Sequence, residues 1–249
     1  MAESRKDTIW QMPELAASYL QVRRRAIPTA DLQIEVMLRL LNALDHPVRR
    51  FLDLGCGDGI LAAAIRAQYP QACGVLVDFS EPMLTAARTR FTGNDQDLHF
   101  YLGDFADARW VDALAPFTPL DAVVSGLAIH HQPDARKRAL YAEIFSLLTP
   151  GGLFLNIEHV AGESPWVATV WDDLYIDYLT RAQTGDGVSR EEVAARYAVR
   201  PDKAANILAP LDTQCAWLRE IGYTDVACYA KIFELAVFGG RRGDPRSAG

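Results

Sequence analysis

A short apolar run followed by glycines on alternate positions constrains this chain more than any other feature. Residues 51–59 read Phe-Leu-Asp-Leu-Gly-Cys-Gly-Asp-Gly, and a helix-forming stretch follows at once. Because glycine has no Cβ, a ligand can lie against the backbone of such a turn, while the next helix presents unpaired N–H groups. The pattern predicts a strand, a tight turn and a helix at a nucleotide-binding site.

The alternation of strand and helix continues along the chain. Apolar and β-branched runs predict strands at residues 49–54, 73–78, 98–102, 121–125 and 153–159, and helices beginning near Asp58, Glu81, Asp134 and Pro165. Two helices, opened by Pro13 and Asp31, precede the first strand. A helix over 211–221 and an antiparallel pair of strands, 225–230 and 232–238, close the chain. This order predicts an α/β fold with a mostly parallel sheet between helices.

Composition excludes several classes of protein. The 249 residues suit one α/β domain with additions, and no apolar run reaches the roughly 18 to 20 residues of a membrane span. The polar residues 1–6 do not resemble a signal peptide, so we expect a cytoplasmic protein with no membrane partner. A net charge of −7 makes nucleic acid an unlikely partner, although residues 23–25 are all arginine.

The cysteines and histidines do not predict a metal site. The four cysteines lie far apart without a Cys-x-x-Cys pair, which argues against a zinc ribbon and against a disulfide framework. His130 and His131 are adjacent, and adjacent residues seldom chelate one ion. We therefore expect no bound metal.

The glycine turn does not fit a dinucleotide site. A dinucleotide fingerprint has the spacing G-x-G-x-x-G, and Ile60 stands where its third glycine belongs. Asp78, at the end of the second strand, lies where a ribose-binding carboxylate is found in a nucleotide-binding βαβ unit. The sequence therefore indicates a ribose without a pyrophosphate, and a dehydrogenase is disfavoured.

Four segments together carry a family resemblance. These are Asp-Leu-Gly-Cys-Gly-Asp-Gly at residues 53–59, Asp78 with the helix start after it, Gly-Asp-Phe at 103–105, and Thr-Pro-Gly-Gly-Leu at 149–153. In this order and at this spacing they resemble a class I S-adenosylmethionine-dependent methyltransferase over about residues 48–160 and the final strand pair. The resemblance implies a seven-stranded Rossmann-like sheet, mostly parallel with an antiparallel C-terminal strand.

Domain limits follow from this resemblance. We expect an N-terminal helical cap at 1–47, a cofactor-binding domain formed by 48–163 and 204–240, a helical insert at 164–203 after the fifth strand, and a flexible tail at 241–249. The insert is rich in aromatic residues and is the expected cap of the acceptor site. Apolar residues on the two helices before the first strand would allow a homodimer, and they would equally allow a lid over the site.

The resemblance also implies which residues bind S-adenosylmethionine and release S-adenosylhomocysteine. Gly55 and Gly57 would approach the methionine part, Asp78 would bind the ribose hydroxyls, and Asp104 would bind the adenine amine. Asp104 could instead cap the following helix, and apolar residues at helix starts could simply belong to the core. The full set is Asp53, Gly55, Gly57, Asp78, Phe79, Met83, Gly103, Asp104, Phe105 and Ser125.

Methyl transfer by in-line displacement makes modest demands on a protein, because alignment and a dry pocket supply most of the rate. A weakly acidic nucleophile also needs a general base, and His130, His131 and Glu158 are the catalytic candidates, with His159 beside them. Related enzymes often carry a histidine here that only orders the loop, and this alternative stays open.

We expect the acceptor to be a small molecule held by the insert. Trp166, Trp171, Tyr175 and Tyr178 recur at helical spacing, either lining the substrate or packing on the sheet. One of the arginines and lysines at 181, 190, 196, 200 and 203 could bind a carboxylate. Two alternatives remain. The first is an enzyme similar to carboxy-S-adenosylmethionine synthases or a tRNA-modifying enzyme, although residues 203–208 contain no equivalent of that synthase's arginine motif. The second is a non-catalytic cofactor-binding protein.

Overall fold

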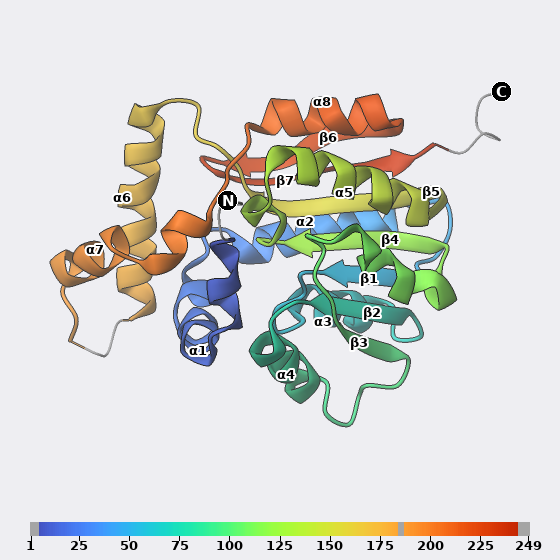
Figure 1. The fold of residues 1–249 in the computed structure, drawn as a ribbon, viewed down its shortest axis with the longest axis horizontal. Helices are drawn as coiled ribbons and strands as arrows, with labels where there is room; N and C mark the ends of the chain where they lie inside the picture. The colour runs from blue at the N-terminus through green and yellow to red at the C-terminus, as the bar shows by residue number, and fades with distance from the viewer. Residues whose placement is uncertain (1–4, 184–186, 244–249) are drawn as a thin grey trace.

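A computed structural model describes residues 5–183 and 187–243, with the side chain of Arg23 left out. Seven strands form one sheet in the order β3-β2-β1-β4-β5-β7-β6 (Figure 1). Neighbours from β3 to β5 are parallel, whereas β7 runs antiparallel to both β5 and β6. The strands are β1 (Arg50–Leu54), β2 (Cys73–Asp78), β3 (Leu98–Leu102), β4 (Leu120–Gly126), β5 (Leu148–His159), β6 (Tyr223–Ile232) and β7 (Leu235–Arg242).

Helices cover both faces of this sheet, and the predicted seven-stranded, mostly parallel fold is confirmed. None of the described helices combines the length and the apolar character needed to cross a bilayer. The α-helices are α1 (Pro13–Gln21), α2 (Ala30–Asn42), α3 (Ile60–Gln68), α4 (Glu81–Arg90), α5 (Asp134–Leu147), α6 (Pro165–Ala182), α7 (Arg190–Ala198) and α8 (Leu211–Ile221). Short 3₁₀ segments lie at Asp7–Gln11, Arg23–Ala26, Ala108–Phe117, Ile129–His131 and Pro201–Ala205.

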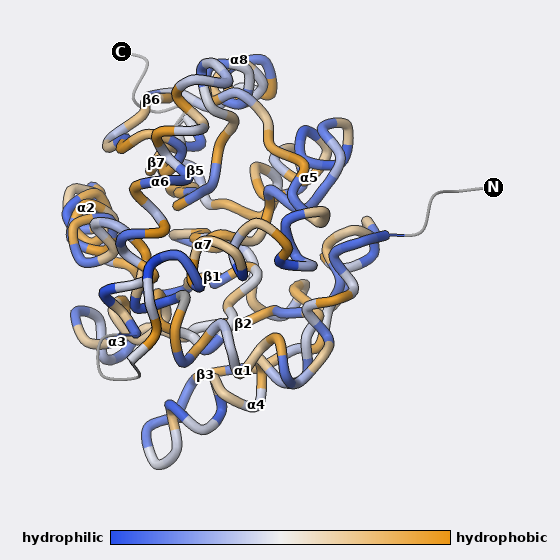
Figure 2. Tube along the Cα trace, turned by 90° about the vertical axis from the view of Figure 1, so that its left-hand side faces the viewer, coloured by the Kyte–Doolittle hydropathy of each residue, from blue (hydrophilic) through white to orange (hydrophobic). Residues whose placement is uncertain are grey.

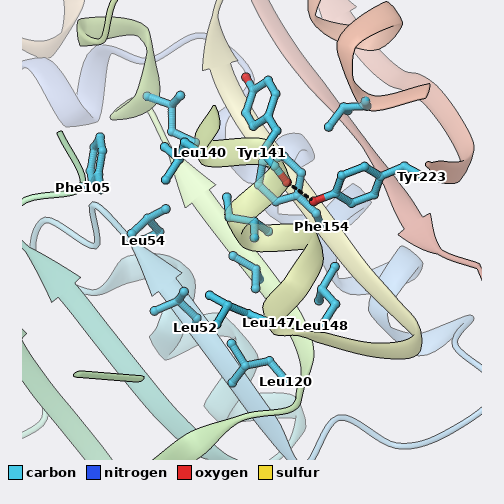
Figure 3. Packing of buried hydrophobic residues seen from close by; sticks show 14 of the residues in the cluster. Leu52, Leu54, Phe105, Leu120, Leu140, Tyr141, Leu147, Leu148, Phe154 and Tyr223 are labelled. Carbon is cyan, nitrogen blue, oxygen red and sulfur yellow. Dashed lines mark hydrogen bonds between the residues drawn. The ribbon is translucent and has the colours of Figure 1, made fainter. Parts of the chain in front are cut away.

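The core has two halves because successive side chains of a strand point to opposite faces. Leu52 and Leu54 of β1 face α5 and α8, whereas Phe51 faces α2 and α3. In the first half, the rings of Tyr141, Phe154 and Tyr223 pack together, and the Tyr223 hydroxyl donates to the Tyr141 carbonyl at 2.9 Å (Figure 3). This packing ties α5 and β6 to β5, whose carboxyl end carries Glu158 and His159.

Two segments at the edges of the predicted domains pack with the sheet. Met37 and Leu41 of α2 are fully buried in the half of the core that contains Phe51. Arg241 and Arg242 belong to β7 rather than to a tail, since Arg241 pairs with Leu153 across the sheet. The remainder of the predicted tail, from residue 244, lies outside the described residues.

The helical insert and α1 lie together at the carboxyl ends of the parallel strands. In Figure 1 the arrowheads of β1 and β4 point toward α1, α6 and α7, and Figure 2 views the molecule from that side. A small core of its own joins the insert to the N-terminal segment, formed by Ala26, Leu179, Val193 and Tyr197. Both parts are therefore placed over the end of the sheet where α/β proteins bind ligands.

Candidate cofactor and acceptor site

One cavity of about 710 Å³ lies at the carboxyl ends of β1 and β4, where the strand order reverses direction. Residues of the glycine turn line one part of it, and residues of α1, α6 and the end of α7 line another. Ligand pockets of proteins range from roughly 300 to 1,000 Å³. The cavity is large enough for a nucleoside cofactor beside a small second molecule.

The glycine turn has the conformation that its sequence predicts. Gly55, Gly57 and Gly59 have φ angles of +67°, +54° and +74°, in the left-handed region that favours glycine. A Cβ on Gly55 would lie 2.3 Å from the Cβ of Ala128, so this position accepts no side chain. The backbone N–H of Gly55 also donates to the carbonyl of Val77 at 2.8 Å, which ties the turn to the end of β2.

Asp78 is buried at the end of β2 and lines the cavity. Its two oxygens accept backbone N–H groups from Gly57 at 2.8 Å and from Ser80 at 2.9 Å. Burial raises the pKa of this carboxyl to about 6, and the two backbone bonds oppose that rise. Each carboxylate oxygen has a second lone pair, so Asp78 can still accept the two hydroxyls of a ribose.

Asp53 supports the start of α3 and offers one unused oxygen. Its Oδ2 accepts the backbone N–H of Ala62 at 3.0 Å, whereas its Oδ1 is buried without a hydrogen-bond partner among the described residues. Burial raises the pKa of Asp53 to about 8. A buried oxygen in a cavity wall is suited to an N–H donor or a cation, such as the ammonium of a methionine moiety. The residues at the turn therefore fit S-adenosylmethionine.

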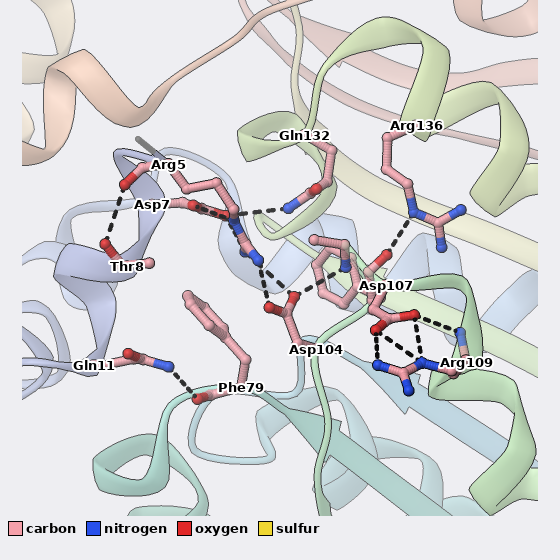
Figure 4. A network of polar contacts seen from close by, with 12 residues as sticks. Arg5, Asp7, Thr8, Gln11, Phe79, Asp104, Asp107, Arg109, Gln132 and Arg136 are labelled. Carbon is pink, nitrogen blue, oxygen red and sulfur yellow. Dashed lines mark hydrogen bonds and ion pairs between the residues drawn. The ribbon is translucent and has the colours of Figure 1, made fainter. Parts of the chain in front are cut away.

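The residues expected around the adenine also line the cavity. Phe79, Met83, Asp104 and Phe105 are all at its wall. Asp104 is already engaged: its Oδ1 accepts the backbone N–H of Ala106 at 2.9 Å, and both oxygens contact the guanidinium of Arg5 (Figure 4). Asp104 thus stabilises a turn, whereas the following helix is capped by Asp107, so the helix-capping alternative for Asp104 was wrong. The Asp104 carboxylate keeps lone-pair capacity for a further donor.

The N-terminal segment that carries Arg5 closes this side of the cavity. Its Asp7 accepts a hydrogen bond from the Gln132 side chain at 3.1 Å, and its Gln11 donates to the Phe79 carbonyl at 3.2 Å (Figure 4). The hydroxyl of Ser80 donates to the carbonyl of Trp10 at 2.7 Å. Sequence reasoning missed these contacts, because no local signal links residues 5–11 to residues about 70 to 125 positions away.

Two residues of the predicted cofactor set do not reach the cavity. Ser125 is fully buried, and its hydroxyl donates to the Leu54 carbonyl at 2.8 Å, so it links β4 to β1. Gly103 lies at the end of β3, where a Cβ would meet a side-chain methyl of Val77 at 3.1 Å. Instead of Ser125, the next residues, Gly126 and Leu127, lie at the wall.

His130 and Glu158 form a buried pair beside the cavity. Nδ1 of His130 lies 2.6 Å from Oε1 of Glu158, and the Glu158 carboxylate also accepts the backbone N–H groups of His130 and His159. These acceptor roles indicate an ionised carboxylate, so Nδ1 carries the proton and Nε2 is left with a free lone pair. Burial lowers the pKa of His130 well below its usual value and keeps the ring neutral.

Among the predicted catalytic residues, only the histidines line the cavity. Glu158 is 1% exposed and lies behind His130, so it positions the imidazole rather than contacting a ligand. His131 donates from Nδ1 to the Ala205 carbonyl at 3.1 Å, and burial lowers its pKa to about 3. His159 forms a second pair, with its Nε2 2.8 Å from Oε2 of Glu234. Sequence reasoning missed Glu234, which is brought here by the turn between β6 and β7.

Aromatic side chains from the insert line the far part of the cavity. Trp171 and Tyr175 stack with ring centroids 5.4 Å apart and planes 10° apart, and Tyr197 meets Tyr175 edge-on at 5.7 Å. Trp166 does not contribute, because 72% of it is exposed on the outer side of α6. Of the expected cations, Arg200 lines the cavity.

Comparison with known proteins shows what this site resembles. A methyltransferase domain matches residues 51–152, which include the glycine turn and both acidic positions. The sheet and its helices have the Rossmann-like fold of class I S-adenosylmethionine-dependent methyltransferases, and the matched domain lies within it. The chain is 34% identical over 128 residues to an uncharacterised methyltransferase of Mycobacterium bovis, covering 48% of this chain. It spans 57% of that relative's length.

Two further similarities cover more of this chain. A carboxy-S-adenosyl-L-methionine synthase of a Shewanella strain is 24% identical over 193 residues, 76% of each chain. The solved structure of human N-acetylserotonin methyltransferase in complex with S-adenosylmethionine aligns with a TM-score of 0.55 at 17% identity, covering 98% of this chain and 60% of that one. At such identity the structural match shows the fold alone, and the methyltransferase domain at residues 51–152 implies use of S-adenosylmethionine.

Proposed function

We propose that this protein transfers the methyl group of S-adenosylmethionine to an oxygen or nitrogen of a small-molecule acceptor. The observation that carries the proposal is the continuity of one cavity from the glycine turn and Asp78 to the imidazole of His130. The cofactor supplies, when bound, an electrophilic methyl group whose transfer leaves a neutral thioether. Everything else that the reaction needs must come from the chain.

The chain's residues supply binding, alignment and a base. Asp78 and the turn hold the nucleoside, and the insert with α1 keeps the acceptor side away from solvent. As the new bond to the methyl carbon forms, the acceptor's O–H or N–H proton passes to Nε2 of His130. The Nδ1 proton stays on the bond to Glu158, whose charge stabilises the imidazolium that results.

The test is formation of S-adenosylhomocysteine with a panel of small phenols and amines, measured for the wild type and for His130→Gln. Glutamine keeps a donor for Glu158 but cannot take the proton, so kcat should fall by about 10²–10⁴-fold while S-adenosylhomocysteine binding is retained. His99→Gln is the matched control, because His99 packs on Phe117 outside the cavity. An unchanged kcat in His130→Gln would refute the base.

A second candidate function has a specific observation in its favour. The similarity to a carboxy-S-adenosyl-L-methionine synthase covers 76% of each chain, although at 24% identity. Such an activity predicts a co-purified nucleoside heavier than S-adenosylmethionine by one CO₂. Native mass spectrometry of the freshly purified protein separates the two candidates directly.

A further inference from the structure

Arg200 is a buried cation in the cavity wall with incomplete pairing. Its side chain is 10% exposed, and the nearest carboxylate oxygen, Oδ2 of Asp202, lies 3.7 Å from Nε. This distance is too long for a hydrogen bond, and Nε has no hydrogen-bond partner in the described part of the chain. A buried charge without hydrogen bonds is costly, so the guanidinium is suited to a ligand that accepts from it.

The insert holds this guanidinium in place by stacking. Its central carbon lies 4.1 Å from the centroid of the Tyr197 ring, and the Tyr197 hydroxyl donates to Oδ1 of Asp172 on α6 at 2.5 Å. Lys203 lies 3.4 Å from the same carboxylate and compensates its charge. Stacking leaves the N–H edge of a guanidinium available, and that planar fork matches a carboxylate.

Other arginines of the cavity wall already form close ion pairs. Arg24 and Arg90 both form ion pairs with Asp58, and Arg5 pairs with Asp7 and Asp104. Arg25 is exposed to solvent. Among the described residues, Arg200 differs from Arg5, Arg24 and Arg90 in that its ion pair, with Asp202 at 3.7 Å, leaves Nε free to donate to a ligand.

An aromatic wall connects Arg200 to the proposed base. The ring of His159 lies 5.6 Å from that of His130 and 6.2 Å from that of Trp171. From Trp171 the wall continues through the stacked Tyr175 to Tyr197, beneath the guanidinium. A planar ring that lay along this wall would have an imidazole near one end and the Arg200 fork near the other.

We propose that the acceptor is a planar aromatic molecule bearing a carboxylate, and that Arg200 binds this carboxylate while the ring packs against Trp171 and Tyr175. The inference rests on the proposed methyl transfer and specifies its acceptor. It makes Arg200 a specificity-determining residue, because a neutral amide offers the guanidinium one acceptor oxygen and no charge, whereas a carboxylate offers two oxygens and a negative charge.

Binding of matched probe pairs tests the proposal without requiring turnover. We would titrate the protein, saturated with S-adenosylhomocysteine, with hydroxylated benzoates and the corresponding benzamides by isothermal calorimetry. The wild type should bind at least one benzoate about tenfold or more tightly than its amide, and Arg200→Gln should remove that preference. Arg200→Lys should retain part of it, since a point charge replaces the fork. Arg196→Gln, which replaces an exposed arginine of α7 that does not line the cavity, is the matched control.

The outcomes distinguish this proposal from the one on which it rests. Failure of S-adenosylhomocysteine to bind refutes the methyltransferase function itself. Binding of S-adenosylhomocysteine with equal affinity for acid and amide, no binding of any benzoate, or an unchanged preference in Arg200→Gln overturns the role of Arg200. If native mass spectrometry instead shows a carboxylated cofactor that is lost in Arg200→Gln, the carboxylate belongs to the cofactor and the acceptor assignment is wrong.

Discussion

Replacement of Asp78 by asparagine should separate cofactor binding from stability. Each Asp78 oxygen accepts one backbone N–H, from Gly57 and from Ser80. The amide group of asparagine can accept only one of them, so a buried N–H is left facing another donor. The variant also loses the charge that would bind the ribose hydroxyls.

The two effects on stability should nearly cancel. An unpaired buried N–H costs about 1–3 kcal/mol. Against this, burial raises the pKa of Asp78 from 3.8 to about 6, so its ionised form costs about 3 kcal/mol of folding free energy above pH 6, which asparagine removes. Binding has no such compensation: hydrogen bonds to a charged group contribute about 1.5–3 kcal/mol, or about 10- to 100-fold in Kd.

The assay is calorimetric titration of Asp78→Asn with S-adenosylhomocysteine at pH 7.5, beside a thermal melt. Asp107→Asn is the control, because Asp107 also accepts a backbone N–H, that of Arg109 at 3.0 Å, but lies outside the cavity. We expect weaker binding with a Tm within a few degrees of the wild type. Unchanged affinity in Asp78→Asn would refute the assignment of this carboxylate to the ribose.

Other parts of the site give predictions of the same kind. Glu158→Gln should lower kcat by about 10²-fold or more with unchanged cofactor affinity, because the amide permits the wrong tautomer of His130; equal turnover would contradict the pair. Gly55→Ala should lower the free energy of unfolding by about 2–4 kcal/mol in chemical denaturation, because its Cβ would lie 2.3 Å from the Cβ of Ala128. Gly57→Ala should lower it by about 1–2 kcal/mol, because a Cβ there meets no atom within 4 Å and only the backbone conformation is unfavourable. Equal losses in the two variants would contradict the steric account. Affinity for S-adenosylhomocysteine should fall about tenfold from pH 7 to pH 5, as Asp78 with its pKa of about 6 becomes protonated; a flat profile would contradict its role.

The parts of the site that depend on local sequence could be predicted. The glycine turn, the strand ending in Asp78 and the antiparallel closing strands follow from backbone requirements that lie within a few residues. The limits of β2 and β3 matched the prediction at both ends. Helix α3 begins two residues later than expected, because Asp58 and Gly59 still belong to the turn.

Contacts between distant segments could not be predicted in the same way. Nothing near Glu234 indicates that it will meet His159, and nothing near Ser125 shows that its hydroxyl is used within the sheet. The pairing of Arg5 with Asp104 joins residues 99 positions apart. Such contacts arise only when the sheet brings its strand ends together, and they decide which candidate side chains face the cavity.

Direct measurement of ligand binding tests the central claim most simply. Native mass spectrometry of the purified wild-type protein, mixed with S-adenosylhomocysteine and NAD in equal amounts, reports which nucleoside the glycine turn selects. The structure predicts a one-to-one complex with S-adenosylhomocysteine that is diminished in Asp78→Asn. A complex with NAD, or no nucleoside complex under any condition, would contradict the account.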